Sequence, residues 1–333
     1  MADKSSKIFL AGHNGMVGSA IYRNLTQNNY TNIIIASHEE LDLRRQSEVD
    51  KFFIIEKPEV VIIAAAKVGG ILANNIYRAD FIYDNLMIAS NLIGAAHKYG
   101  VEKLIFLGSS CIYPKMAKQP IKEEELLNGY LEYTNEPYAI AKIAGIKLCE
   151  SFYRQYNANY FSVMPCNLYG PYDNFDLKNS HVLPALLRKF HEAVNIDKNK
   201  KNGRFEHSVP DSVTVWGTGE PEREFLYVED LASAVRFMLE NVNASDIYEE
   251  GISHLNVGSG SDVTISRLAH IIAGITKYEG EIVFDASRPD GTPKKLMDSS
   301  RINKLGWRST MPLAEGIRLT YDWYKAYRAF YDN

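Results

Sequence analysis

The sequence has few cysteines, no long apolar run and no excess of charge of one sign. Its three cysteines, Cys111, Cys149 and Cys166, are too few and odd in number for a disulfide framework, so we expect a reduced, cytoplasmic protein. The longest apolar run, at residues 60–66, is far shorter than the roughly 20 residues of a membrane-spanning helix, and the polar N-terminus is unlike a signal peptide. Lys and Arg number 37 against 41 Asp and Glu, which argues against a nucleic-acid-binding protein.

The remaining composition is that of an ordinary globular protein, with 333 residues, 46% hydrophobic and 23% charged. In the first half, short apolar runs alternate with longer helical patterns, which is typical of a parallel sheet with crossover helices. The runs are at 8–11, 33–36, 60–63, 104–107 and 160–164, and the helical patterns at 17–28, 45–56, 80–99 and 138–156. We therefore predict an α/β fold with a Rossmann-type doubly wound parallel sheet.

The second half has shorter segments, which indicates a separate unit. We expect a dinucleotide-binding domain at 1–166, with returns near 225–260, and a smaller, partly interleaved substrate domain at 167–333. Residues 255–257 could rejoin the first sheet, the polar stretch 197–204 is expected to be a surface loop, and the tail at 301–331 is expected to be helical.

A glycine-rich segment, GHNGMVG at residues 12–18, follows the first apolar run directly and leads into a helical pattern. Gly12, Gly15 and Gly18 allow a tight turn, close approach of a pyrophosphate and close packing of helix on strand. The helix N-terminus then offers free N–H groups to the phosphates. The placement between a strand and a helix predicts a dinucleotide site.

The end of the second apolar run bears on the choice between NAD and NADP. NAD sites commonly place an Asp or Glu there to bind the ribose 2′-hydroxyl. This chain has Ala36, Ser37 and His38 instead, which favours NADP, although the neighbouring Glu39 keeps NAD open.

A second group of residues predicts carbonyl chemistry. Ser109 follows the fourth apolar run, at the edge where open α/β sheets bind ligands. Tyr138 and Lys142 are four residues apart, hence on one helix face, and the ammonium is expected to lower the pKa of the phenol. The pair is nonspecific by itself, because Tyr138 could equally be a structural aromatic residue.

Six motifs together carry a family resemblance: GHNGMVG at 12–18, AAAKVGG at 64–70, GSSCIYP at 108–114, NEPYAIAK at 135–142, NLYGP at 167–171 and NSH at 179–181. They resemble the extended short-chain dehydrogenases/reductases and, among these, the GDP-L-fucose synthase family, over residues 7–323. The resemblance implies NADPH-dependent 3,5-epimerisation and C4 reduction of a GDP-4-keto-6-deoxy-mannose-type sugar, giving GDP-L-fucose. NAD is the less favoured cofactor.

The resemblance also implies residue roles. Ser109, Tyr138 and Lys142 match the reductase triad, and Cys111 and His181 match the pair that moves the protons at C3 and C5 of the sugar. From the residues alone, Cys111 could be a small buried hydrophobe and His181 could cap a helix. No Cys-x-x-Cys or His-x-x-x-His spacing predicts a metal site. The implied cofactor contacts are Gly12, Asn14, Gly15, Met16, Val17, Gly18, His38, Leu107, Gly108, Ser109, Tyr138, Lys142, Pro165, Asn167, Leu168 and His181.

The same resemblance places the GDP-sugar on the second domain. The implied substrate contacts are Lys189, Trp216, Arg223, Asp290 and Lys295, although such side chains could also be solvated surface groups. Relatives commonly carry Arg at the position of Asn14 and again near His38 for the NADP 2′-phosphate, so NADPH and NADH both stay open for this chain. Family habit also predicts a homodimer through helices at 86–97 and 140–153.

Alternative functions remain at this point. A GDP-4-keto-6-deoxy-heptose could replace the hexose, or the protein could catalyse C4 reduction only. A 4-epimerase or 4,6-dehydratase is disfavoured, because dehydratases place Asp-Glu where this chain has Ser110 and Cys111. A nucleotide-sensing module without catalysis is the alternative from another class of protein.

Overall fold

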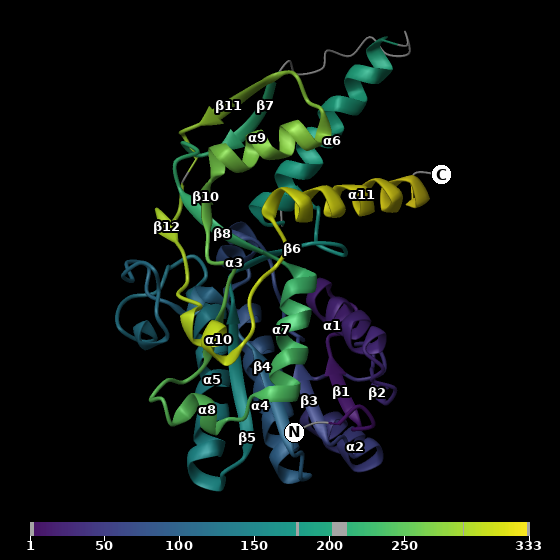
Figure 1. The fold of residues 1–333 in the computed structure, drawn as a ribbon, viewed down its shortest axis with the longest axis vertical. Coiled ribbons are helices and arrows are strands. Elements are labelled where there is room, and N and C mark those ends of the chain that lie inside the picture. Colours follow the sequence, from purple (N-terminus) through teal and green to yellow (C-terminus); the bar gives the residue numbers. More distant parts are fainter. Residues whose placement is uncertain (1–2, 178–179, 202–211, 289, 332–333) are drawn as a thin grey trace.

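The computed structural model describes residues 3–177, 180–201, 212–288 and 290–331, and its larger part is built on a parallel sheet (Figure 1). The strand order is β2-β1-β3-β4-β5-β9. The strands span β1 (Ile8–Ala11), β2 (Ile33–Ile34), β3 (Val60–Ile63), β4 (Lys103–Leu107), β5 (Asn159–Pro165) and β9 (Leu255–Val257). The sheet confirms the predicted α/β fold and the return of residues 255–257 to it.

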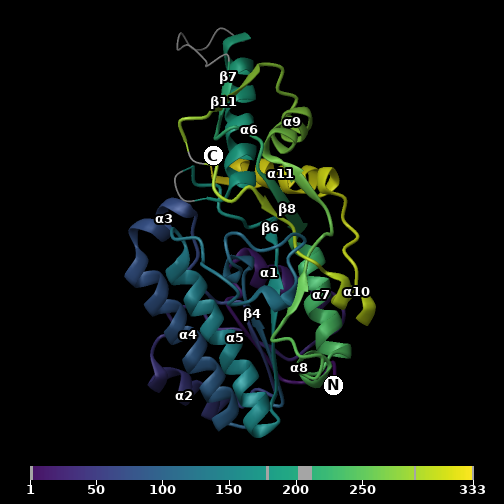
Figure 2. The same cartoon turned by 90° about the vertical axis from the view of Figure 1, so that its left-hand side faces the viewer.

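Helices cover both faces of this sheet, which explains why its central strands are continuous apolar runs. Every residue of β1, β3 and β4 is buried. In Figure 2, α4 and α5 lie side by side on one face, and α7 lies on the opposite side. The helices of this part are α1 (Met16–Gln27), α2 (Gln46–Glu56), α3 (Ile71–Ile76), α4 (Arg78–Lys98), α5 (Glu136–Tyr156), α7 (Val228–Asn241) and α8 (Ser245–Tyr248).

The smaller part has its own hydrophobic core, in which three helices pack against short strands at one end of the molecule (Figure 1). Its helices are α6 (Val182–Lys201), α9 (Ile265–Thr276) and α11 (Leu313–Tyr331). The strands β7 (Ser212–Trp216) and β11 (Glu281–Asp285) pair in parallel, and β8 (Glu222–Tyr227) pairs with β6 (Asn167–Tyr169), β10 (Asp262–Thr264) and β12 (Lys294–Lys295).

The chain crosses between the two cores more than once. After β8 it returns to the larger core, where α7 packs against α1 and β9 pairs with β5. α10 (Ser300–Leu305) also packs near β9 before α11 completes the smaller core. We propose that the two cores are the two interleaved domains expected from the sequence.

Two local expectations need correction. The polar stretch at 197–204 is helical as far as Lys201, because α6 continues to that residue, and its remainder lies outside the described residues. The helical tail is two helices, since α10 ends at Gly306 with φ 116° and α11 begins at Leu313. No helix in the described ranges is long and apolar enough to cross a membrane. The three cysteines are free thiols.

Candidate active site

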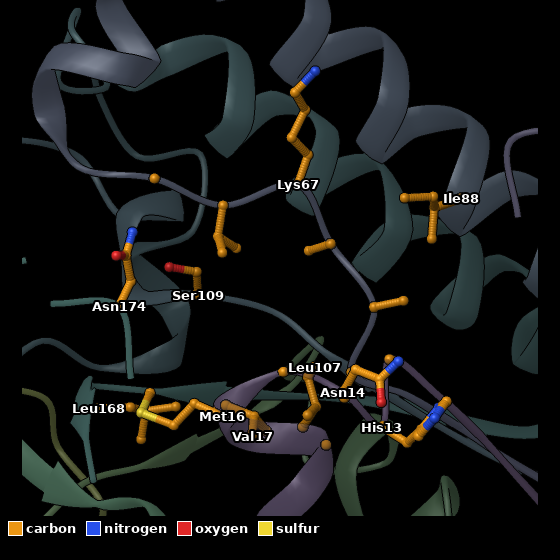
Figure 3. Close-up of a pocket in the computed structure, with 18 of the residues that line it drawn as sticks. His13, Asn14, Met16, Val17, Lys67, Ile88, Leu107, Ser109, Leu168 and Asn174 are labelled. Atoms are coloured by element: carbon orange, nitrogen blue, oxygen red, sulfur yellow. The ribbon is translucent and has the colours of Figure 1, made fainter. Parts of the chain in front are cut away.

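A cleft of about 700 Å³ lies at the carboxyl ends of β1, β3, β4 and β5, the edge at which open α/β sheets bind ligands. Figure 3 shows part of its lining, with the glycine-rich loop on one side and the segment around Lys67 on the other. Every residue predicted to contact the cofactor lines this cleft: Gly12, Asn14, Gly15, Met16, Val17, Gly18, His38, Leu107, Gly108, Ser109, Tyr138, Lys142, Pro165, Asn167, Leu168 and His181.

The glycine-rich loop fits a dinucleotide pyrophosphate. Gly12 has φ +90°, and a Cβ added at Gly18 would lie 2.0 Å from the carbonyl oxygen of Gly12, so no side chain fits between loop and helix. Gly15 lies in the open part of the loop, directly before α1, whose N-terminal N–H groups are free to bind an anion. Nδ1 of His13 is buried and has no hydrogen-bond partner among the described residues. The residues present therefore fit the cofactor that the fold implies.

Ser109, Tyr138 and Lys142 converge on one wall of the cleft. Ser109 lies two residues beyond the end of β4, and its hydroxyl points into the cavity in Figure 3. Tyr138 and Lys142 lie one turn apart on α5, and the Lys142 side chain is buried beneath the phenol. Nζ of Lys142 donates a hydrogen bond to the carbonyl oxygen of Leu107 at 2.7 Å. Lys142 thus connects α5 to the end of β4, the segment that presents Ser109.

The expectation that the pKa of Tyr138 is lowered is wrong in direction. Burial raises the pKa of the Tyr138 phenol, nearby Cys111 raises it further, and the interaction with Ser109 only partly offsets this. Nζ of Lys142 lies 5.8 Å from the centre of the Tyr138 ring and donates to Leu107 instead, and desolvation is the largest cause of the raised pKa of the phenol. The structure presents Tyr138 as a protonated acid. Burial also lowers the pKa of Lys142 to about 8.

Cys111 lies just behind the cleft lining, in the short 3₁₀ helix Ser110–Ile112. Its N–H faces the hydroxyl oxygen of Ser109 at 3.5 Å. Burial raises the pKa of the thiol, and the positive charges of Lys295 and Lys142 act in the opposite direction. The sulfur is thus close enough to the triad to interact with Tyr138 and Lys142 electrostatically. Cys149 lies in the core, while Cys166 lines the cleft.

The loop that carries Cys111 is anchored from below by a buried polar network. The hydroxyl of Tyr113 donates to Oδ1 of Asn256 on β9 at 2.5 Å and lies 2.6 Å from Nε2 of His254. Burial lowers the pKa of His254 to about 3, so this imidazole is neutral and its hydrogen bonds do not change at physiological pH. The network fixes the end of β4 against the last strand of the sheet.

His181 lines the cleft and directly precedes α6. Desolvation within the cleft lowers the pKa of the imidazole, and the charge of Lys295 lowers it further. Lys295 therefore acts on both Cys111 and His181. It reaches this position because β12 pairs with β8, which sets Lys295 beside Arg223.

The five predicted substrate residues lie outside the cleft lining, and their contacts join Lys189 to Trp216, and Asp290 and Lys295 to Arg223. Trp216 is 56% exposed, and Nζ of Lys189 lies 5.7 Å from its ring centre. Asp290 accepts hydrogen bonds from the backbone N–H and hydroxyl of Thr218 at 2.7 and 2.9 Å, and its carbonyl oxygen accepts from Arg223 at 3.4 Å. An exposed aromatic face flanked by cations suits a nucleoside diphosphate.

Several cleft residues escaped sequence reasoning: Asp42, Arg44, Lys67, Asp173 and Asn174. In Figure 3 the Lys67 side chain points away toward α4, where its Nζ donates to Asp84 at 2.9 Å. The rule that ligands bind beyond strand ends could have suggested Lys67, which follows β3. Within the described ranges, no group of three or more His, Cys, Asp and Glu side chains is placed to hold a metal ion.

Comparison with known proteins identifies the family of this chain. The model of the NAD dependent epimerase/dehydratase family matches residues 8–258. The chain is 54% identical over 324 residues to GDP-L-fucose synthase 1 of Arabidopsis thaliana, covering 97% of this chain and 94% of that protein. It is 54% identical over 322 residues to the GDP-L-fucose synthase of Escherichia coli K12, covering 96% of each.

A solved structure resembles the whole chain. It is a GDP-mannoheptose C4 reductase from Campylobacter jejuni with NADP bound, at 41% identity and a TM-score of 0.88, covering 98% of this chain and 100% of that one. The chain thus belongs to the NAD-dependent epimerase/dehydratase family and, within it, to the family of the GDP-L-fucose synthases.

Proposed function

We propose that this protein converts GDP-4-keto-6-deoxy-mannose to GDP-L-fucose by 3,5-epimerisation and NADPH-dependent reduction at C4. The observation that carries the proposal is the convergence of Ser109, Tyr138 and Lys142 on the cleft that holds the glycine-rich loop, with Cys111 beside them. Relatives named GDP-L-fucose synthase, at more than half identity over nearly the whole chain, support the substrate.

The reductive half needs a proton donor and an orienting group at the C4 oxygen. The cofactor, when bound, supplies a hydride to C4. Tyr138 gives its proton to the C4 oxygen, a role that suits a phenol whose pKa is raised by burial. Ser109 donates a hydrogen bond to the same oxygen, and Lys142 holds the nicotinamide ribose from its buried position on α5.

The epimerising half moves protons on the two carbons that flank the ketone. Cys111 and His181 share this work, one removing a proton and the other returning one to the opposite face. The enolate oxygen accepts hydrogen bonds from Tyr138 and Ser109. A buried thiol is a poor base by itself, so the nearby positive charges of Lys295 and Lys142 support its thiolate.

The GDP moiety lies on the smaller core. Its base stacks on the exposed ring of Trp216, and Lys189, Arg223 and Lys295 neutralise the pyrophosphate. Asp290 orients the segment that carries Arg223 and Thr218 through its hydrogen bonds. This arrangement directs the sugar toward Cys111, because Lys295 is beside Arg223 on the GDP side and its charge also acts on the Cys111 thiol.

The outer faces of α4 and α5 form a homodimer interface in this proposal. The two helices pack against each other along their length, and Tyr83 and Ile140 are large exposed hydrophobic side chains on them (Figure 2). Light scattering at micromolar concentration is expected to give twice the mass of one chain, and Ile140→Asp is expected to give monomers. A monomeric wild type would contradict this interface.

A second candidate substrate is a GDP-4-keto-6-deoxy-heptose, because the Campylobacter jejuni structure similar to this chain is named as a heptose reductase. The two candidates separate in one assay. We expect the hexose to be turned over with a higher kcat/KM than the heptose when both GDP-4-keto sugars are offered with NADPH and products are identified by NMR. Faster turnover of the heptose would reverse the order, and turnover of neither would refute the proposed function.

A further inference from the structure

An ion-pair network forms the part of the cleft that follows β2. Oδ1 and Oδ2 of Asp42 accept hydrogen bonds from Nε and Nη2 of Arg44 at 2.9 and 2.8 Å, so one guanidinium holds both carboxylate oxygens. Nη1 of Arg44 lies 3.4 Å from Oδ1 of Asp84, whose other oxygen accepts from Lys67 at 2.9 Å. All four side chains belong to residues that line the cleft.

This end of the cleft is where a bound dinucleotide places its adenosine ribose. A carboxylate there accepts hydrogen bonds from the 2′-hydroxyl of NAD, whereas a cation there accommodates the 2′-phosphate of NADP. Glu39, which kept NAD open on sequence grounds, is exposed and does not line the cleft. Of the three acids that follow β2 closely, Glu39, Glu40 and Asp42, the one that lines the cleft is Asp42.

The pairing with Arg44 removes Asp42 from that role. Both of its oxygens already accept from Arg44, and its side chain is only 15% exposed. The same guanidinium holds the pKa of the Asp42 carboxyl down to about 2, so the acid is ionised and its charge is matched. His38 adds a further nitrogen, with Nδ1 at 3.9 Å from Asp42.

We propose that Arg44 sets the preference for NADP over NAD, by occupying the Asp42 carboxylate so that it neither repels the 2′-phosphate of NADP nor binds the ribose 2′-hydroxyl of NAD. The inference rests on the proposed NADPH dependence and names the residues that enforce it. Without Arg44, the freed carboxylate of Asp42 would repel a phosphate and accept a hydrogen bond from a ribose hydroxyl.

The test measures binding without turnover. Dissociation constants of NADPH, NADH and 2′,5′-ADP are measured by calorimetry for the wild type, Arg44→Leu, Arg45→Leu and the double variant Asp42→Asn/Arg44→Leu. Arg45→Leu is the matched control, because it removes the same charge one residue away. Nε of Arg45 lies 3.6 Å from Asp42, but Arg45 does not line the cleft. Arg44→Leu is expected to lower the preference for NADPH over NADH at least about tenfold, the size of one lost charge-assisted hydrogen bond.

The controls decide the outcome. Arg45→Leu is expected to change the ratio of the NADPH and NADH dissociation constants less than about threefold. The double variant is expected to lose the tighter NADH binding of Arg44→Leu, because Asn carries no charge. An unchanged ratio in Arg44→Leu, or an equal change in Arg45→Leu, would overturn the inference while leaving the proposed function intact. A wild type that binds neither NADPH nor NADH would overturn both.

Discussion

Two buried lysines have the same lowered pKa, but their replacement by Met is predicted to have opposite effects on the stability of the folded protein. Lys142 and Lys103 are 4% and 3% exposed, and burial lowers the pKa of each to about 8. Lys142 has one acceptor, the carbonyl oxygen of Leu107. Lys103 donates to three carbonyl oxygens at the end of α7, those of Met238, Leu239 and Val242, at 3.0, 2.8 and 2.6 Å.

The magnitude follows from the pKa difference between folded and unfolded protein. A shift from 10.5 to about 8 destabilises the folded protein by about 3 kcal/mol at pH 7, where the amine is charged in both states. Loss of the hydrogen bond to Leu107 offsets about 1–3 kcal/mol of this, so Lys142→Met is expected to equal or exceed the wild type in stability at pH 7. Lys103→Met leaves three buried carbonyl oxygens unpaired. This variant should therefore be less stable than Lys142→Met, which leaves one unpaired, by on the order of 3 kcal/mol or more.

The pH dependence of stability tests independently whether charged Lys142 destabilises the folded protein. A lysine whose folded pKa lies below its unfolded pKa binds fewer protons when folded, so its penalty persists below pH 8 and disappears as pH rises toward 10.5. The stability of the wild type relative to Lys142→Met should therefore rise by about 2 kcal/mol between pH 7 and about pH 9.5.

Urea unfolding followed by circular dichroism, at both pH values and for all three proteins, measures these differences. If Lys142→Met were as unstable as Lys103→Met at pH 7, with no change in the difference at higher pH, the reasoning would be refuted. The expected result means that Lys142 is retained for its function in the cleft, at some expense of stability.

Three further predictions concern the cleft. Gly18→Ala, whose Cβ would lie 2.0 Å from the Gly12 carbonyl oxygen, should lose NADPH binding, whereas Gly274→Ala, on α9 away from the cleft and with nothing within 4 Å of an added Cβ, should keep it within about threefold; equal affinities by calorimetry would contradict the loop geometry. Cys111→Ser should abolish entry of solvent deuterium at C3 and C5 of the sugar, and undiminished exchange by NMR would reject Cys111 as the proton-transfer group. Burial raises the pKa of Asp173 to about 7, so the folded protein binds the extra proton and loses stability as pH rises from about 4 through 7; Asp173→Asn should flatten this part of the thermal-stability profile, and an identical profile would show that Asp173 does not titrate there.

The strands, loop and helix that line the site could be predicted from the sequence, because each depends on residues close together along the chain. The runs at Ile8–Ala11 and Val60–Ile63 are strands with these bounds, since a strand covered on both faces must be apolar at every position. The glycine-rich loop and the Tyr138–Lys142 pair depend only on short spacing along the chain, and both lie on the cleft.

What the sequence could not give depends on contacts between distant segments. Lys295 approaches Cys111 and His181 because β12 pairs with β8, which no local pattern indicates. Arg44 meets Asp84 across 40 residues of sequence. The direction of the Tyr138 pKa shift could not be predicted either, because four-residue spacing places Lys142 nearby but does not show that the phenol is buried.

The most direct test of the account is the conversion of GDP-4-keto-6-deoxy-mannose with NADPH in D₂O, followed by NMR of the isolated product. Inversion at both flanking carbons followed by hydride transfer predicts GDP-L-fucose with solvent deuterium on carbon at C3 and C5, protium at C4, and one NADPH consumed for each product formed. A reduced sugar that keeps protium at both C3 and C5 would contradict the account and leave only a C4 reductase.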